Sequence, residues 1–220
     1  MSEKVIISKD YFKKGMQDWI REFLEYKYLI LLSLIVVAIA TFLDYFSGVY
    51  VSSTATATVP DLILDYIGPI DMRFLFVYGY LAVGFSFFLY PILFHIRKLH
   101  IVISQFSVLV IIRSIFIVFT HLQRPADAIV ISFPWILKGL SFENDMFFSG
   151  HTAIPFLGFL LFKKSKIRYF FLAGSVFLGI AVLAMHEHYS IDVFSAFFIT
   201  YCSYKVGWVL IRKSTKLIKH

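Results

Sequence analysis

Charged residues are scarce in this sequence, and their scarcity excludes an ordinary soluble domain. They make up 16% of the 220 residues, whereas soluble domains carry about 25%. Cysteine is nearly absent, and the single Cys202 excludes an intrachain disulfide. Hydrophobic residues account for 59% of the chain, and the mean hydropathy is +0.78. This composition predicts an integral membrane protein that forms one compact domain.

Six apolar segments make up most of the chain after residue 27. They span residues 28–43, 74–94, 101–120, 146–162, 169–185 and 191–210. Each is near the ~17–25 residues that a helix needs to cross a bilayer. The sequence therefore predicts an all-α membrane protein, with six transmembrane helices in one bundle over residues 28–211. The linker between the third and fourth segments contains an apolar stretch, 128–137, which we expect to fold against the bundle or lie at the membrane interface.

Polar segments flank the predicted bundle at both ends of the chain. Within residues 1–27, apolar and aromatic side chains recur at near-helical spacing between Tyr11 and Tyr26. This spacing is typical of a short amphipathic helix on the membrane surface, although a solvated tail would have the same composition. Residues 212–220 form a basic tail.

Basic residues gather at alternate ends of the apolar segments. Residues 1–27, 95–100, 163–168 and 205–220 hold 17 of the 21 lysines and arginines, and the opposite ends hold nine of the 14 acids. Basic loops face the cytoplasm, so both termini are predicted to be cytoplasmic. The net charge of +7 is thus a topology signal and does not indicate a nucleic-acid partner.

Two histidine-containing clusters lie at the same end of a predicted helical hairpin. His151 opens the fourth apolar segment, and His188 with Asp192 follows the fifth. An antiparallel hairpin returns to the face where it began, which brings both histidines to the outer face: periplasm, lumen or cell exterior. Ionisable groups at the rim of the hydrocarbon are expensive and indicate function. We take these residues as a candidate catalytic site.

The spacing of His188 and Asp192 suits a nucleophile with an orienting carboxylate. Four residues apart on a helix, they share one face, so the carboxylate can accept a hydrogen bond from one ring nitrogen. The other nitrogen then keeps a lone pair that can attack an electrophile. The alternative is a polar pair that only satisfies itself. Before His151, Gly150 permits close backbone approach, and Ser149 either caps the helix or donates to a phosphate at the helix start.

Arg113 lies inside the third apolar segment, near its outer end. An arginine at this depth is a candidate for binding a phosphate group, and its alternative is a salt bridge to Asp145 or another carboxylate. A zinc site is a weaker alternative, because His186 and His188 are two apart and point in different directions on a helix, whereas helical zinc motifs place histidines four apart. No metal or organic cofactor is expected.

Two motifs resemble those of the sphingomyelin synthase-like branch of the type-2 phosphatidic acid phosphatase superfamily. They are Asp145-x-x-x-Ser149-Gly150-His151-Thr152 and His186-Glu187-His188-Tyr189-Ser190-Ile191-Asp192-Val193. A third stretch, Arg113-Ser114 with Thr120-His121-Leu122, is similar to the family's third helix. The resemblance implies a catalytic triad of His151, His188 and Asp192. It also makes substrate-binding candidates of the neighbouring motif residues, namely Arg113, Asp145, Ser149, Gly150 and Tyr189.

The resemblance implies transfer of a phosphorylated head group between lipids through a phosphohistidine. The donor would be a phospholipid, and the acceptor a lipid hydroxyl of the ceramide or diacylglycerol type. The broader superfamily has a basic residue seven positions before an Arg-Pro pair, but here Ile117 stands seven positions before Arg124-Pro125. This difference favours the synthase-like branch over its alternative, a lipid phosphate phosphatase. A non-catalytic transporter, with the histidines as a proton relay, is the alternative from another class.

The charge distribution predicts which loops are accessible from outside the cell. With Cys202 removed as background, a cysteine placed at Lys164 should be protected from an impermeant thiol reagent in intact cells. A cysteine placed at Ala126 should be labelled. The reverse pattern would contradict both the orientation and the outward-facing site.

Overall fold

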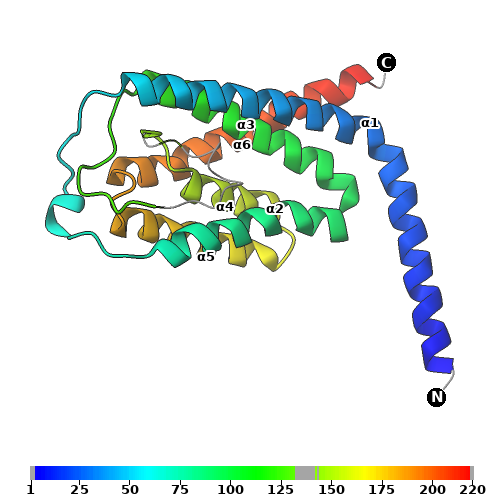
Figure 1. The fold of residues 1–220 in the computed structure, drawn as a ribbon. Helices are drawn as coiled ribbons and strands as arrows, with labels where there is room; N and C mark the ends of the chain where they lie inside the picture. Colours follow the sequence, from blue (N-terminus) through cyan, green and yellow to red (C-terminus); the bar gives the residue numbers. More distant parts are fainter. Residues whose placement is uncertain (1–2, 132–141, 143, 219–220) are drawn as a thin grey trace.

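The computed structural model describes residues 3–131, 142 and 144–218 (Figure 1). All regular elements in these ranges are helical, as the sequence predicts for an all-α protein. A π-helical turn, Leu75–Gly79, leads into the second helix. The six α-helices are α1 Glu3–Thr54, α2 Tyr80–Phe94, α3 Leu99–Phe119, α4 Gly150–Leu161, α5 Ile167–Ala184 and α6 Ser190–Ile218.

Five helical stretches in the described ranges are long and apolar enough to cross a membrane. They are Gly15–Thr54, Leu75–Phe94, Ile96–Phe119, Ile167–Ala184 and Ser190–Lys213. The fourth predicted segment differs, because α4 has 12 residues and is about 18 Å long, well below the ~30 Å of a hydrocarbon core. Its helix begins only at Gly150, since the preceding backbone is not helical and Phe147 adopts a φ of 54°. The protein is a multi-pass membrane protein, and its described residues contain five candidate spans and one shorter apolar helix.

The N-terminal segment is continuous with the first span. The sequence predicts a separate short helix at 11–26, but α1 runs unbroken from Glu3 to Thr54. Figure 1 shows its first part turning away from the bundle. The Trp19 indole donates a hydrogen bond of 2.7 Å to the carbonyl of Ile92, and Phe23 packs on the buried cluster around Ile96. This part of α1 is therefore tied to the turn that joins α2 and α3.

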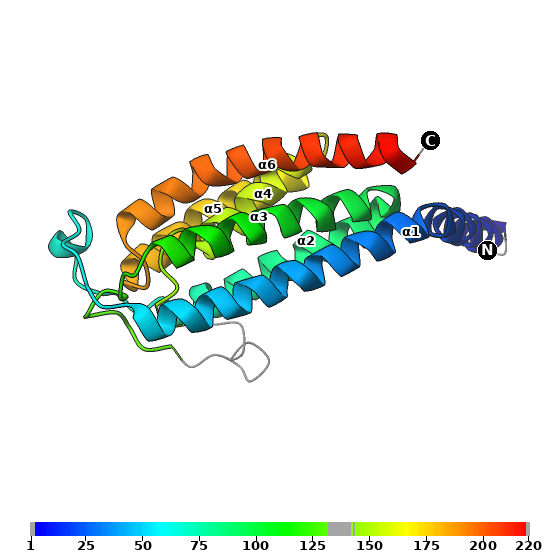
Figure 2. The same cartoon turned by 90° about the horizontal axis from the view of Figure 1, so that it is seen from above.

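The connections between the helices lie at two opposite ends of the bundle. Both termini lie at one end with the α2–α3 and α4–α5 turns, which are the basic segments, and the longer loops lie at the other (Figure 1 and Figure 2). Within the bundle, α1 packs along α3, and α4 packs on α5 and α6. The core holds fully buried aromatic and aliphatic side chains such as Phe87, Phe148, Leu157 and Phe171.

The longer loops are bonded to one another and to the bundle. The amide of Gln123 donates to the carbonyl of Ala57 at 2.9 Å, and the amide of Ile129 donates to that of Met185 at 3.0 Å. Ile129 and Ile131 pack against the cluster around Val182. The described part of the predicted apolar stretch thus folds back against the bundle, whereas its residues 132–137 lie outside the described residues.

The contact between α4 and α5 requires a glycine. A Cβ at Gly158 would lie 2.7 Å from ring carbons of the fully buried Phe171. We expect Gly158→Ala to lower the free energy of unfolding by about 1–3 kcal/mol, because a buried ring cannot move aside easily. Gly84→Ala on α2 is the control, since a Cβ there meets nothing within 4 Å. Thermal unfolding in detergent measures both, and equal stability of the two variants would contradict this packing.

Candidate active site

A cavity of about 250 Å³ lies at the end of the bundle opposite the basic turns. It is lined by groups from α1, the start of α2, α3, the start of α4 and the α5–α6 connection. Both histidines of the predicted triad, His151 and His188, line it. The polar side chains around them are those of Thr41, Asp44, Tyr80, Arg113, Asp145 and Glu187.

His188 and Asp192 form the pair that their spacing suggests. Nδ1 of His188 lies 3.2 Å from Oδ2 of Asp192, and the carboxylate is completely buried. The same oxygen accepts a 3.1 Å hydrogen bond from the amide of Tyr189. Asp192 lies in the first turn of α6, which begins at Ser190. The carboxylate is thus held in place. It orients the imidazole of His188 through Nδ1, so Nε2 is not used in this pair and can act as a nucleophile.

His151 lies in the first turn of α4, with its ring packed on two aromatic rings. The ring centroids of Phe76 and Tyr80 are 4.0 and 4.1 Å from that of His151. Its Nε2 has no hydrogen-bond partner among the described residues. The start of α4 is joined to α6 by a 3.1 Å bond from the amide of Ser149 to the carbonyl of Asp192. This bond explains how two segments far apart in sequence place their histidines around one cavity.

Ser149 neither caps α4 nor lines the cavity. It occupies the N-cap position with an extended backbone, but its side chain makes no capping bond. Its buried hydroxyl has no partner within the part of the chain that the structure describes. The capping alternative is therefore not realised in this structure. Gly150, in contrast, does line the cavity.

Arg113 is held by three acceptors. Its Nε donates to the carbonyl of Phe148 at 3.2 Å, Nη1 to Asp44 at 3.3 Å, and Nη2 to Asp145 at 2.5 Å. The salt bridge to Asp145, weighed above as an alternative, is therefore present. Sequence reasoning missed Asp44, although an acid at the end of an apolar run was the available signal. The guanidinium still lines the cavity beside the histidines.

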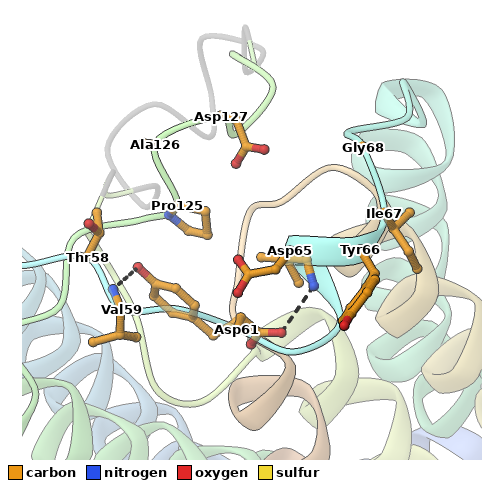
Figure 3. A pocket seen from close by; sticks show the side chains of 12 residues that line it. Thr58, Val59, Asp61, Asp65, Tyr66, Ile67, Gly68, Pro125, Ala126 and Asp127 are labelled. Atoms are coloured by element: carbon orange, nitrogen blue, oxygen red, sulfur yellow. Dashed lines mark hydrogen bonds between the residues drawn. The ribbon is translucent and has the colours of Figure 1, made fainter.

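Tyr189 lies away from the histidine cavity. It is buried, its hydroxyl donates to the carbonyl of Gln123 at 2.9 Å, and it accepts from the amide of Val59 at 3.3 Å. It borders a second pocket of about 450 Å³ between the loops, in which Asp61, Asp65 and Asp127 are the acidic residues (Figure 3). Burial raises the pKa of the Tyr189 phenol above its ordinary value. In this structure Tyr189 joins loops and does not face the cavity.

Asp61 is a residue that sequence reasoning did not single out. One carboxylate oxygen accepts from the amide and the hydroxyl of Ser190, at 2.7 and 2.8 Å, and so caps α6. The other accepts from the amides of Ile63 and Leu64, in a local turn typical of aspartate. Burial alone would raise the pKa of Asp61, but these hydrogen bonds together lower it. The loop after α1 thereby fixes the helix start that follows His188.

The other residues of the second motif have partners outside the triad. Nδ1 of the buried His186 lies 2.9 Å from a carboxylate oxygen of Asp127. Glu187 lines the cavity and lies 3.6 Å from Arg124. Among the described residues, no group of three or more His, Cys, Asp and Glu side chains converges as metal ligands.

Comparison with known proteins places this site in a family context. Residues 144–209 match the family model "PAP2 superfamily C-terminal", which covers both histidine motifs. Sphingomyelin synthase-related protein 1 of Mus musculus is 40% identical over 83 residues, which are 35% of this chain and 17% of that protein. The Homo sapiens protein of the same name is 40% identical over 81 residues, 34% and 20% of the two chains. The matches thus span about a fifth of these relatives' length. No solved structure matches the chain.

The hydrogen bonds of Asp61 predict a loss in the Asp61→Asn variant. An amide NH₂ cannot accept from the donors that one carboxylate oxygen now binds, so we expect a loss of about 1–3 kcal/mol in unfolding free energy. Turnover should fall too, because α6 carries Asp192. Hydrogen bonding lowers the pKa of Asp61 in the folded state. The carboxylate's contribution to the free energy of unfolding is therefore complete above the ordinary pKa of 3.8, and it is lost as the pH falls through the pKa of the folded state.

The control for Asp61 is the neighbouring Asp65→Asn variant. Asp65 is exposed and belongs to the same pocket, so the substitution removes the same charge without touching α6. Unfolding and activity are measured for both variants at pH 7. Equal losses in the two variants would show that charge in the pocket, and not the bonds to Ser190, is responsible.

Proposed function

We propose that this chain, which matches the PAP2 superfamily C-terminal model over residues 144–209 and is similar there to sphingomyelin synthase-related protein 1, moves a phosphorylated head group between membrane lipids. The donor is a phospholipid, and the acceptor is a lipid hydroxyl of the ceramide or diacylglycerol type. The observation that carries the proposal is the cavity in which His151, His188 and Arg113 meet. It lies opposite the basic turns, which supports a site that faces away from the cytoplasm.

In the first half-reaction, Nε2 of His188 attacks phosphorus and forms a P–N bond. The bond between phosphorus and the lipid oxygen breaks, and His151 gives its proton to the departing alkoxide. Asp192, bonded to Nδ1 of His188, stabilises the positive charge that develops on the ring. The phosphorylated head group is then held as a phosphohistidine, and the first lipid leaves with a free hydroxyl.

In the second half-reaction, the acceptor hydroxyl attacks the same phosphorus. His151, now neutral, takes the hydroxyl proton, and the P–N bond breaks to return His188 to its first state. Arg113 and the amides at the start of α4 stabilise the phosphoryl oxygens in both steps. Every proton and bond is accounted for by the two lipids and these residues.

The charges around the cavity favour a diester over a monoester. Arg113 is accompanied by two carboxylates, Asp44 and Asp145, at 3.3 and 2.5 Å. A phosphomonoester brings close to two negative charges and a diester only one, so a monoesterase needs more cationic groups. Ile117, which stands where the wider superfamily has a basic residue, is completely buried in the bundle. These features support transfer from a phosphodiester lipid over release of phosphate from phosphatidic acid.

The experiment compares two reactions of the purified protein. One measures head-group transfer from a labelled phosphodiester lipid to ceramide or diacylglycerol, and the other measures phosphate release from phosphatidic acid. We expect transfer to be faster. Faster phosphate release would assign the protein to the lipid phosphatases, which use the same attack at phosphorus with water as the acceptor.

Substitutions in the triad test the intermediate. We expect His188→Ala to abolish turnover, because it removes the nucleophile, and His151→Ala to reduce it by about 10²–10⁴-fold. Asp192→Asn should cost less than His188→Ala, because it misorients the imidazole without removing it. His121→Ala is the control, since His121 is exposed and packs on Tyr50. Full activity in His188→Ala would rule out the phosphohistidine.

A further inference from the structure

Tyr80 borders the candidate site through two different parts of its side chain. It is the first residue of α2, directly after the π-helical turn, and it lines the histidine cavity. Its ring packs on that of His151, with centroids 4.1 Å apart and planes 31° apart. Its hydroxyl points toward the start of α4, where a Cβ built on Gly150 would lie 3.9 Å from the phenolic oxygen.

The hydroxyl of Tyr80 converges with other donors on the same point. The same Cβ on Gly150 would lie 3.7 Å from Nε of Arg113, so the phenol and the guanidinium border one space beside the helix start. The first amides of a helix are donors without partners inside the helix, and they favour an anion. A phosphoryl oxygen in this space would meet the phenol, the first amides of α4 and an Nη hydrogen of Arg113, since the Nε hydrogen is bonded to the carbonyl of Phe148.

Among the hydrogen bonds of the described residues, none involves the hydroxyl of Tyr80. The nearby carboxylates of Asp44 and Asp145 are instead engaged by Arg113. A donor that faces a cavity and has no protein acceptor is satisfied by water or by a ligand. Phe76, the other ring that packs on His151, has no such donor, so the two rings in contact with the imidazole are not equivalent.

We propose that Tyr80 is a further catalytic residue of the reaction proposed above, on which this inference rests. Its O–H donates a hydrogen bond to a nonbridging oxygen of the transferred phosphoryl group, and its ring fixes the orientation of His151. No proton is transferred to or from the phenol, and no bond to it forms or breaks. The hydrogen bond strengthens as negative charge builds on the oxygen in the transition state.

The test compares Tyr80→Phe with Tyr78→Phe. The first substitution keeps the ring on His151 and removes only the hydroxyl, and the second removes the hydroxyl of an exposed tyrosine two residues earlier. We expect Tyr80→Phe to lower kcat for head-group transfer by about 10–100-fold with a smaller change in KM, as for the loss of one donor to the transition state. Tyr78→Phe should match the wild type, and all three proteins should unfold at the same temperature.

A second measurement uses orthovanadate, which binds phosphoryl-transfer sites as a five-coordinate mimic of the transition state. Ligand-induced rise in Tm gives its affinity without any lipid. We expect about 10–100-fold weaker binding in Tyr80→Phe and wild-type binding in Tyr78→Phe, as the loss of one hydrogen bond to a charged group implies. A further variant, Tyr80→Leu, also removes the ring from His151 and should lose more activity than Tyr80→Phe.

The outcomes separate this inference from the function on which it rests. Wild-type kcat and wild-type vanadate affinity in Tyr80→Phe would overturn the role of Tyr80. The proposed transfer reaction would still stand in that case if His188→Ala were inactive. Weakened vanadate binding without any head-group transfer would support the contact of Tyr80 with a phosphoryl group and overturn the transfer reaction. No vanadate binding to the wild type together with no head-group transfer would overturn both.

Discussion

A guanidinium inside a membrane bundle has to be paired, and this requirement organises the site. Arg113 projects from α3 and meets Asp44 on α1, Asp145 before α4 and the carbonyl of Phe148. Leaving one partner of a buried ion pair alone destabilises a protein by about 3–5 kcal/mol, so these three segments are held together. The same pairing places a cation beside the histidines and offsets its charge with two carboxylates. One group therefore contributes to the stability of the fold and to the charge of the candidate site.

A second polar network holds the other half of the site from the loop side. Asp61 caps α6 through Ser190, and Tyr189 bonds to the two loops that follow α1 and α3. Because Tyr189 and Ser190 directly follow His188, the loops that bind them determine where the proposed nucleophile lies. The bond from Ser149 to Asp192 then joins this half to the start of α4. The histidines are thus positioned by backbone and loop contacts that take no part in the proposed chemistry.

The site combines few cations with many carboxylates, and this balance limits its chemistry. Arg113 lies among Asp44, Asp145 and Glu187, and Glu187 is itself within 3.6 Å of Arg124. A phosphate that enters such a cavity gains most from directed donors, since the summed charge offers little attraction. Helix amides, a phenol and one guanidinium are donors of this kind. The proposed transfer between lipids requires the site to bind a singly charged phosphodiester, and one guanidinium with directed neutral donors suits such a group.

The sequence by itself determined the all-helical membrane class, five of the spans and the pairing of His188 with Asp192. Each of these follows from local spacing: apolar run length for the spans, and a separation of four residues for the pair. Only the tertiary structure decided the length of α4, which depends on the backbone before Gly150, and the unbroken course of α1. Likewise Asp44, Asp61 and Tyr80 lie about 70 to 130 residues from the groups that they contact, and their meeting depends on how the helices are rotated against one another. No local pattern encodes that rotation, because it arises from packing across the whole bundle.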